Sequence, residues 1–527
     1  MKSASSGTRP NLFRFSAAMT GETNQALRAH LLRDDGQEDL CMAVYRPSTG
    51  ATRQTAILTD VILPLAGETT VHGNVSFTGS YVLRAIQIAS ELGAGLAILH
   101  SHPGAFGWQR MSRYDKDAEA SYANVTREIT GLPLVGMTLA GADGAWSARF
   151  WNRGAGRDVS HVSCENVRVI GERLTVTWND ELVPPPRVDA TQTRTVSCWG
   201  PRTHADVARL RVLVLGAGTI GLEVSVRLAA TGLQTVASMD FDSMKLINLD
   251  RMPGATELDV WLDRSKIEVA LRLMRENATA RPFSAVGIEG SVCEPEQFAQ
   301  ALDYDLIFCC IDDHPWPRSI ANAIAYSDLI PVVDGGIHVD AFADGDGMRN
   351  ATWRSHVLRP GRPCMACNGQ LDLGDVQADR AGLLEDKEYI AGLPPSARPQ
   401  SQNVAALSVS ATASLLAQFV SFVVAPAGLG DPGPLRYSLS THTLEHVSAT
   451  TRQHCPVERG ALAGDQRQVL LGEHAVARAE TSRREHSASR PVVVLARAID
   501  RSLTKARALL TNRLGHARNA RRRDARS

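Results

Sequence analysis

Short apolar runs alternate with amphipathic segments between residues 22 and 151. A short apolar run predicts a buried strand, and apolar residues at every third or fourth position predict a helix. This pattern predicts helices over 22–32, 80–92 and 114–129, and strands over 40–45, 55–63, 94–99, 134–139 and 145–151. The strand over 94–99 delivers His100 at its end. We therefore expect a compact α/β unit.

A second alternating stretch opens at Leu210 and predicts a parallel sheet. A strand, a glycine-rich turn, a helix and a second strand form one βαβ unit at its start. The predicted strands cover 212–215, 235–240, 306–311 and 330–334, and the first helix covers 222–231. The predicted fold class is α/β, with an N-terminal α/β domain followed by a Rossmann-like, doubly wound domain.

The other segments lack this alternation. The stretch before the second unit carries Pro184-Pro185-Pro186 and predicts a connector with a few short strands. Beyond about residue 480 Arg recurs, and one basic helix is predicted over 492–514. The predicted organisation is a domain over 1–155, a connector over 156–205, a domain over 206–455 and a basic, partly helical tail over 456–527.

Composition limits the expected partners. At 527 residues and 44% hydrophobic content, the chain is long and apolar enough for two or three cores. Lys plus Arg and Asp plus Glu are both 56, so the net charge gives no reason to expect a nucleic acid or a membrane surface as partner. The Arg-rich tail could dock an acidic partner, RNA or a membrane, but it lacks interleaved aromatic residues for base stacking. A solvated basic helix is the alternative.

The thiols and the N-terminus indicate where the protein resides. Nine Cys are spread over a chain that has no leading apolar segment, which predicts reduced thiols and a cytoplasmic location. We expect no run of about 20 apolar residues of the kind that spans a membrane.

The motif His100-Ser101-His102-Pro103, followed by Ser112 and Asp115, predicts a metal site. Histidines at positions i and i+2 of an extended segment project to one face, and an Asp on the following helix supplies a third ligand. Three protein ligands leave a fourth position for a water, which zinc activates near neutral pH. The alternatives are structural histidines at a strand end, or an intact fold with an inactive site.

This pattern resembles the JAMM (MPN/JAB) metalloprotease family, which removes ubiquitin-like proteins from isopeptide or C-terminal amide bonds. The spacer between Pro103 and Ser112 is longer than the family pattern. The resemblance implies Zn²⁺ bound by His100, His102 and Asp115, oxyanion support from Ser112, and Glu38 as general acid/base, with Asp39 as the alternative.

The run from Gly216 through Gly218 to Gly221 predicts a tight turn that holds an anion at a helix N-terminus. Asp240, about 20 positions further on, would suit a ribose in an NAD-dependent enzyme or an ATP-dependent one. The strings Asp240-Phe241-Asp242 and Asn248-Leu249-Asp250-Arg251 resemble the ThiF/MoeB family, whose adenylylating fold is shared with ubiquitin-activating enzymes.

The resemblance covers about residues 190 to 455 and implies further roles. Arg194 matches an arginine that reaches the phosphates, often across a dimer, which implies a homodimer. Lys266 matches the phosphate-binding lysine, and Asp312 matches the aspartate that coordinates Mg²⁺. The implied site for Mg-ATP comprises Gly216, Gly218, Gly221, Asp240, Asp242, Asn248, Arg251, Lys266 and Asp312, with Arg194, Arg251 and Lys266 in catalytic roles.

The cysteines depart from the family pattern in two ways. Cys364 and Cys367 resemble half of the family's zinc site, but the second pair survives only as Cys455. With His454 or Glu458 these three could hold a structural Zn²⁺, and free buried thiols are the alternative. No Cys lies between Cys367 and Cys455, where many family members carry the thioester cysteine. The chain would then stop at the adenylate, use an external nucleophile, or use another cysteine such as Cys293.

Together the two resemblances predict a bifunctional enzyme. The first site would cleave at the C-terminal tail of a small ubiquitin-like or sulfur-carrier protein with Zn²⁺, and the second would adenylate that tail with Mg-ATP. A conjugating enzyme is a further candidate partner. The other hypotheses are an NAD-dependent oxidoreductase with a zinc domain, and a non-catalytic scaffold that binds a ubiquitin-like protein.

Overall fold

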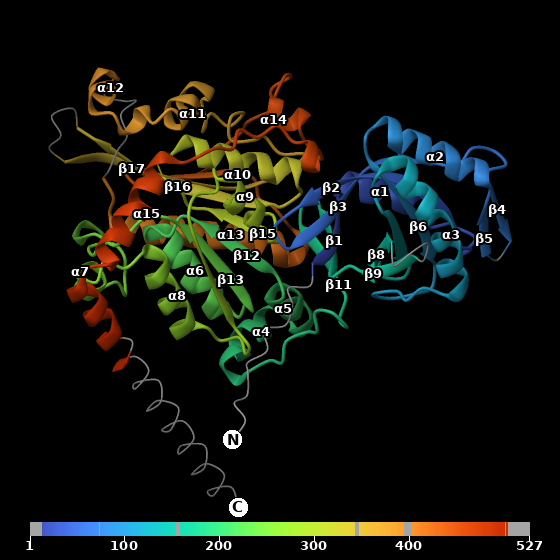
Figure 1. Ribbon diagram of the computed structural model, residues 1–527, viewed down its shortest axis with the longest axis horizontal. Helices are drawn as coiled ribbons and strands as arrows, with labels where there is room; N and C mark the ends of the chain where they lie inside the picture. Colours follow the sequence, from blue (N-terminus) through green and yellow to red (C-terminus); the bar gives the residue numbers. More distant parts are fainter. Residues whose placement is uncertain are drawn as a thin grey trace, which may run out of the picture.

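The computed structural model describes residues 13–72, 74–153, 159–312, 314–342, 347–394, 402–500 and 502–503. Two α/β domains lie side by side in it, each built on its own sheet (Figure 1). The expected α/β class is therefore confirmed.

The first domain contains a nine-stranded sheet of order β11-β10-β1-β3-β2-β6-β7-β8-β9. Its strands are β1 (Arg14–Thr20), β2 (Leu40–Thr49), β3 (Arg53–Ile62), β6 (Gly95–His102), β7 (Leu134–Ala140), β8 (Trp146–Arg153), β9 (Val159–Ser163), β10 (Asn166–Ile170) and β11 (Leu174–Trp178), beside a hairpin of β4 (Thr69–His72) and β5 (Asn74–Phe77). Its helices are α1 (Gly21–Leu31), α2 (Gly79–Glu91) and α3 (Arg113–Thr130).

The first sheet extends past the expected domain boundary at residue 155. Strands β9, β10 and β11 lie in the predicted connector over 156–205, yet β10 pairs in parallel with β1 and β9 pairs with β8. The pairing of β10 with β1 joins residues about 150 positions apart, with Ser16 opposite Asn166. Such long-range pairing is not visible in local periodicity, so the structure moves the end of this domain to Trp178.

Alternate side chains of β6 point to opposite faces of the first sheet and pack in different cores. Leu96 and Ile98 pack in the core beneath α2 and α3, whereas Ala97 and Leu99 pack in the core shared with α1. Because successive strand residues point to opposite faces, His100 and His102 continue the row of Leu96 and Ile98 toward α3.

The second domain contains an eight-stranded sheet of order β14-β13-β12-β15-β16-β17-β18-β19, parallel from β14 to β16 and antiparallel beyond. Its strands are β12 (Arg211–Leu215), β13 (Thr235–Asp240), β14 (Ser284–Glu289), β15 (Leu306–Cys309), β16 (Val332–Ala341), β17 (Met348–Leu358), β18 (Leu435–Ser438) and β19 (Thr443–His446).

Helices cover both faces of the second sheet, as a doubly wound fold requires. Residues of α6, α8 and α13 fill one core, and residues of α9 and α10 fill the other. The helices are α4 (Thr193–Trp199), α5 (Pro201–Ala208), α6 (Thr219–Thr231), α7 (Glu257–Trp261), α8 (Lys266–Asn277), α9 (Pro295–Ala301), α10 (Pro315–Ser327), α11 (Leu373–Arg380), α12 (Lys387–Gly392), α13 (Ala405–Val424), α14 (Pro456–Arg459) and α15 (Ala475–Ala488).

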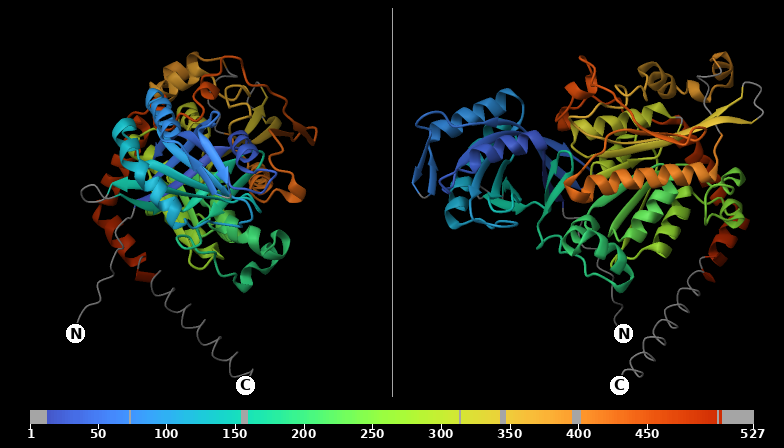
Figure 2. Two further views of the ribbon diagram at one scale, coloured as in Figure 1. Left: turned by 90° about the vertical axis from the view of Figure 1, so that its right-hand side faces the viewer. Right: turned by 180° about the vertical axis from the view of Figure 1, so that it is seen from behind.

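Helix α13 corrects one expectation about apolar runs. By length and composition alone it is long and apolar enough to cross a membrane, so the expectation that no such run exists was wrong. It lies along one face of the second sheet (Figure 2), where Leu415, Phe419 and Phe422 are buried in the core. Burial against β16, β17 and α6 accounts for its apolar character.

A buried ion cluster joins the two domains. Asp305, just before β15, lies 2.6 Å from Arg53 Nη1 and 3.0 Å from Arg168 Nη1, and all three side chains are at most 1% exposed. Burial raises the pKa of Asp305, but the two arginines outweigh it and the net shift is downward. Asp305 also accepts a hydrogen bond from the Arg211 backbone N–H at 3.0 Å, where β12 begins. The first domain therefore docks on the amino edge of the second sheet.

Candidate functional sites

His100, His102 and Asp115 bring three metal-ligating atoms together at one end of the first sheet, all within 4.8 Å of one another. His100 Nε2 lies 3.3 Å from His102 Nε2 and 3.7 Å from Asp115 Oδ1. The histidines come from alternate positions of β6, and the aspartate from the first turn of α3. Two imidazoles and one carboxylate form a donor set that fits a catalytic zinc ion with one open position.

Two neighbours orient these ligands. Ser112 caps α3: its Oγ accepts a hydrogen bond from Asp115 N at 3.2 Å, and its own N–H donates to Asp115 Oδ2 at 2.8 Å. Asp115 Oδ1 faces His100. The Ser112 hydroxyl, which accepts a hydrogen bond from Asp115 N, can still donate its own proton to another group. Gln109 Oε1 lies 3.1 Å from His102 Nδ1, so that nitrogen is the donor and Nε2 is free to ligate. The sequence did not single out Gln109.

Glu38, and not Asp39, is the carboxylate beside this group. Burial raises the pKa of Glu38, the charge of His102 lowers it and that of Asp115 raises it, which places the carboxylate within electrostatic range of both ligands. Asp39 is engaged elsewhere, because its carboxylate accepts from Leu40 N at 2.8 Å and pairs with Arg33 at 3.3 Å. Because Asp39 is engaged elsewhere, Glu38 stays the predicted group that exchanges a proton.

His100 is held in its neutral form. Burial, with a smaller contribution from the charge of Arg149, lowers the pKa of His100 to about 3. Arg149 is ion-paired with buried Glu119, and it donates to Thr138 Oγ1 at 2.9 Å, next to the His100 ring. A neutral imidazole is the form that binds metal ions, so this buried arginine supports the predicted role of His100.

A cavity of about 870 Å³ opens at the carboxyl edge of the second sheet, where ligands of open α/β sheets bind. Its lining includes every residue predicted for the ATP site except Gly221. The predicted residues that line the cavity are Gly216, Gly218, Asp240, Asp242, Asn248, Arg251, Lys266 and Asp312. Their assignment as nucleotide or magnesium ligands stays a prediction.

Gly221 packs behind the turn that the other two glycines form. Gly216 has φ +86°, and a Cβ there would lie 2.7 Å from the Cys310 carbonyl oxygen. A Cβ on Gly221 would lie 1.8 Å from the Gly216 carbonyl oxygen. Both glycines are required for the strand and α6 to approach closely, while Gly218 precedes the first residue of α6 with open space beside it.

Charged groups surround this turn. Asp240 accepts hydrogen bonds from Ala217 N at 2.6 Å and Asp242 N at 2.7 Å. Lys266 Nζ lies 2.6 Å from Asp242 Oδ2. Burial lowers the pKa of Lys266, but the carboxylates of Asp240 and Asp242 outweigh it, so the net shift is upward and the ammonium group is charged at neutral pH. A fixed cation therefore stands beside a phosphate-binding turn.

The Asn248–Arg251 loop forms another wall of the cavity. Asn248 Oδ1 accepts from Lys245 N at 2.9 Å and closes the loop. Arg251 pairs with Asp250 at 2.8 Å and donates to the Ile247 carbonyl oxygen. Asn248 and Arg251 both line the cavity, so this loop adds the Arg251 cation to that of Lys266.

Arg194 lies away from the cavity of its own chain. It is exposed on α4. The preceding Gln192 donates to Thr279 Oγ1 at 3.4 Å, close to where β13 begins, at the amino edge of the sheet. The structure does not bring Arg194 together with the other predicted residues, and a role across a dimer stays a prediction.

A buried network that no sequence motif indicated borders the cavity, which two of its members, Arg318 and Asp334, line. Arg318 lies 3.1 Å from Asp334, and Asp334 lies 3.1 Å from His356 Nε2. Burial raises the pKa of Asp334, but Arg318 and His356 outweigh it and lower it well below its usual range. These residues come from α10, β16 and β17, so no local spacing could have connected them.

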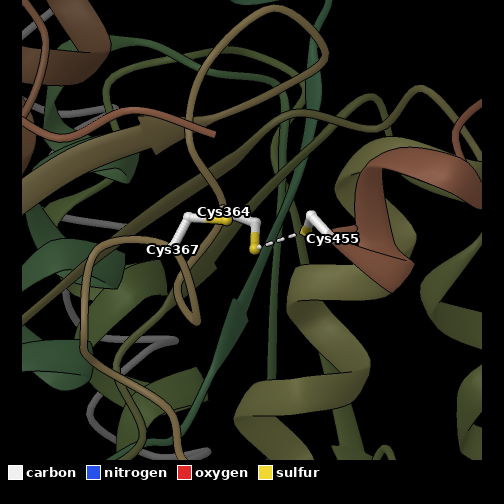
Figure 3. A group of neighbouring side chains, drawn as sticks. All are labelled: Cys364, Cys367 and Cys455. Carbon is white, nitrogen blue, oxygen red and sulfur yellow. Dashed lines mark hydrogen bonds between the residues drawn. The ribbon is translucent and has the colours of Figure 1, made fainter. Parts of the chain in front are cut away.

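Cys364, Cys367 and Cys455 meet as the sequence suggested (Figure 3). Cys364 Sγ and Cys455 Sγ are 3.5 Å apart, and all three sulfur atoms lie within 4.8 Å of one another. Among the described residues neither His454 nor Glu458 joins this group. Three thiolates suit zinc, with the fourth ligand coming from outside the group. Cys293 is buried, and burial raises the pKa of its thiol, which disfavours it as a nucleophile.

Comparison with known protein families gives a match across the second domain. Residues 190–453 match the ThiF family. The NEDD8-activating enzyme E1 catalytic subunit of Caenorhabditis elegans is 27% identical over 151 residues, which cover 26% of this chain and 34% of that protein. The molybdopterin-synthase adenylyltransferase of Escherichia coli (strain K12) is 27% identical over 146 residues, which cover 26% of this chain and 55% of that protein.

The chain thus spans about a third and about half of the length of these curated relatives. Among solved structures, E. coli MccB with ATP is 19% identical with a TM-score of 0.38, covering 51% of this chain and 74% of that chain. The family match includes the glycine turn, the Asn248–Arg251 loop, Cys364 and Cys367. Cys455 lies just beyond its end. On the strength of that match over half of its length, the chain belongs to the ThiF family.

Proposed function

We propose that the second domain adenylates the C-terminal carboxylate of a small ubiquitin-like or sulfur-carrier protein. The observation that carries this proposal is the convergence of the glycine turn, Lys266 and Arg251 on one cavity beside Asp240. A carboxylate oxygen of the tail attacks the α-phosphorus of ATP, the bond between that phosphorus and the bridging oxygen breaks, and pyrophosphate leaves. Membership of the ThiF family supports this reaction over NAD-dependent chemistry.

Each residue has a stated task in this reaction. The backbone N–H groups at the start of α6 hold a phosphate, and Asp240 binds the ribose. Lys266 and Arg251 stabilise the charge that develops on the departing pyrophosphate. Asp312 is the proposed ligand of Mg²⁺, which would neutralise phosphate charge when bound. Arg194 of a second copy is proposed to complete the site in a homodimer.

The test is ATP–pyrophosphate exchange in the presence of a candidate ubiquitin-like protein. Lys266→Ala and Arg251→Ala should each lower the exchange rate by roughly 10²-fold or more, because each removes a cation from the transition state. Arg227→Ala is the matched control, since Arg227 is 59% exposed on α6 and pairs with Glu223 at 3.2 Å on the same helix. Exchange that survives both variants would contradict the proposal, and no exchange with any candidate would favour the scaffold hypothesis.

We propose that the activated tail passes to a nucleophile outside this chain. No Cys lies between Cys367 and Cys455, and Cys293 is buried. Cys198 is exposed but lies on α4, near the amino edge of the sheet and away from the cavity. A conjugating enzyme with its own cysteine, an amine or a sulfur source would each serve as acceptor. The test is whether a labelled tail becomes bound to this chain through a thioester that an added thiol cleaves by exchange.

We propose a second activity for the first domain, cleavage at the tail of the same class of protein. The support is the cluster of His100, His102 and Asp115 with Glu38 beside it. A zinc ion bound there would lower the pKa of a water toward about 7. Glu38 takes the proton of the attacking water and returns it to the leaving amine, and the Ser112 hydroxyl donates to the oxyanion. Intact mass of a tail-extended substrate tests the cleavage.

The two sites are separated by at least the length of one strand. Leu40 of β2 pairs with His100, and Thr49 at the other end of β2 contacts Asp465 in the part of the chain that follows the second domain. At about 3.3 Å per residue, β2 alone separates the ends by roughly 30 Å. The cavity lies beyond this, at the far edge of the second sheet. One tail therefore cannot occupy both sites of one chain at once, and a cleaved tail is released before it is activated.

A further inference from the structure

The nucleotide cavity is closed on one side by a segment outside the region that matches the ThiF family. Residues 464–488, here called the C-terminal strap, follow the family match, which ends at residue 453. Two strap residues, His474 and Val476, line the cavity. They were not predicted as site residues, because they fall in the predicted basic, partly helical tail over 456–527.

Hydrogen bonds anchor the strap before it reaches the cavity. Asp465 accepts from the Thr49 hydroxyl at 2.6 Å in the first domain. Further along, the Trp316 indole N–H donates to the Leu470 carbonyl oxygen at 2.8 Å, and Gly472 N donates to the Cys293 carbonyl oxygen at 2.9 Å. The segment that carries His474 is therefore held on two elements of the second domain.

Helix α15 anchors the strap on the other side of His474. Glu480 accepts from Ser243 N at 3.2 Å. Arg484 donates to the Phe241 carbonyl oxygen at 3.2 Å and pairs with Glu289 at 2.6 Å, and it is 8% exposed. Phe241 follows the proposed ribose ligand Asp240, so the strap is tied to the loops that border the nucleotide.

His474 presents an unsatisfied polar atom at this border. The side chain is 3% exposed, and its Nδ1 has no hydrogen-bond partner among the described residues. Its ring lies 5.2 Å from that of Phe241 and 5.5 Å from that of Trp316. Burial lowers the pKa of His474, and His314 lowers it further, so the ring is neutral near pH 7. A buried polar atom without a partner costs stability unless a ligand supplies one.

The orientation of a nucleotide bound in the cavity indicates which of its groups would lie beside His474. With phosphates on the glycine turn of β12 and the ribose on Asp240 of β13, the base extends further along the sheet, toward β14. The cavity continues in that direction along Gly290, Ser291 and Val292, which follow β14. We propose that His474 of the strap binds the adenine base of ATP through a hydrogen bond from its imidazole ring. This inference rests on the proposed adenylation.

The test is binding of a non-hydrolysable Mg-ATP analogue by calorimetry, together with pyrophosphate exchange, on the full chain. His474→Ala should weaken binding by roughly three- to tenfold, the effect of one hydrogen bond. It should raise KM for ATP and leave kcat at saturating ATP unchanged, since the base does not react. His474→Asn keeps a polar group near the position of Nδ1 and should recover part of the lost affinity. A folding defect alone would not place the affinity of His474→Asn between those of the unaltered chain and His474→Ala.

Two further variants keep the proposal falsifiable. Arg484→Ala loosens the strap without altering the imidazole and should weaken binding in the same direction. Glu485→Ala, at an exposed position of the same helix, should bind as the unaltered chain does. If the unaltered chain binds the analogue and His474→Ala binds it equally well, the inference about the base is wrong while the adenylation proposal stands. If the unaltered chain does not bind it, both fall.

Discussion

Replacing Asp305 by alanine should weaken the junction between the two domains. The carboxylate lies 2.6 Å from Arg53 and 3.0 Å from Arg168, and it forms an ion pair with both guanidinium groups. The arginines belong to the first domain and the aspartate to the second. Their side chains are 1% and 0% exposed, so water cannot replace the lost carboxylate while the domains stay docked.

The expected magnitude follows from this burial. Breaking a fully buried ion pair by removing one partner costs roughly 3–5 kcal/mol, because the remaining charge stays desolvated. In Asp305→Ala two guanidinium groups lose their counter-charge. At roughly 2–4 °C per kcal/mol for domains of this size, the melting temperature should fall by about 10 °C. The chain can also relieve the cost by undocking, in which case the radius of gyration rises.

Scanning calorimetry and small-angle X-ray scattering measure these two outcomes. Glu445→Ala is the matched control, because Glu445 pairs with Arg436 at 2.7 Å but both side chains are about half exposed. Loss of this surface pair should change stability by at most about 1 kcal/mol. Adding Arg53→Met and Arg168→Met to Asp305→Ala should recover much of the loss, since no charge is then buried unpaired.

A melting temperature and a radius of gyration that match those of Glu445→Ala would refute this reasoning. It would mean that the two arginines do not depend on Asp305 for their charge balance. Failure of the triple variant to recover stability, despite a large loss in the single one, would assign the effect to packing and not to charge.

Three further predictions follow from the sites and the interface. Asp115→Asn should abolish tail cleavage and lower the zinc content by one ion per chain, while pyrophosphate exchange continues; loss of both activities would contradict independent sites. Cys455→Ala should remove a second zinc ion by elemental analysis, and an unchanged metal content would favour free thiols. Burial raises the pKa of Asp328 from 3.8 to about 6, so its contribution to stability is present below the lower value and lost as the pH rises through the higher one. The difference in melting temperature between the protein and Asp328→Asn should therefore change between about pH 4 and pH 6 and level off above that range, and a constant difference from pH 4 to 6 would contradict this.

Local spacing in the sequence determined much of both candidate sites. His100 and His102 share a face because they occupy alternate positions of one strand, and Asp115 follows in the first turn of the next helix. Gly216 and Gly221 are required wherever a strand and a helix approach closely, so the turn is readable without a fold. These features depend on residues close together in the chain, and their geometry follows from the periods of the strand and the helix.

Tertiary structure decided what depends on distant residues. It engaged Asp39 with Arg33 and the Leu40 amide, which leaves Glu38 as the predicted general acid/base. It joined β10 to β1, and it brought His474 from the tail to the cavity. No period or spacing connects these positions, since their proximity results from packing between elements far apart in the chain. Burial then sets the electrostatics of such groups, and burial exists only once the domains have assembled.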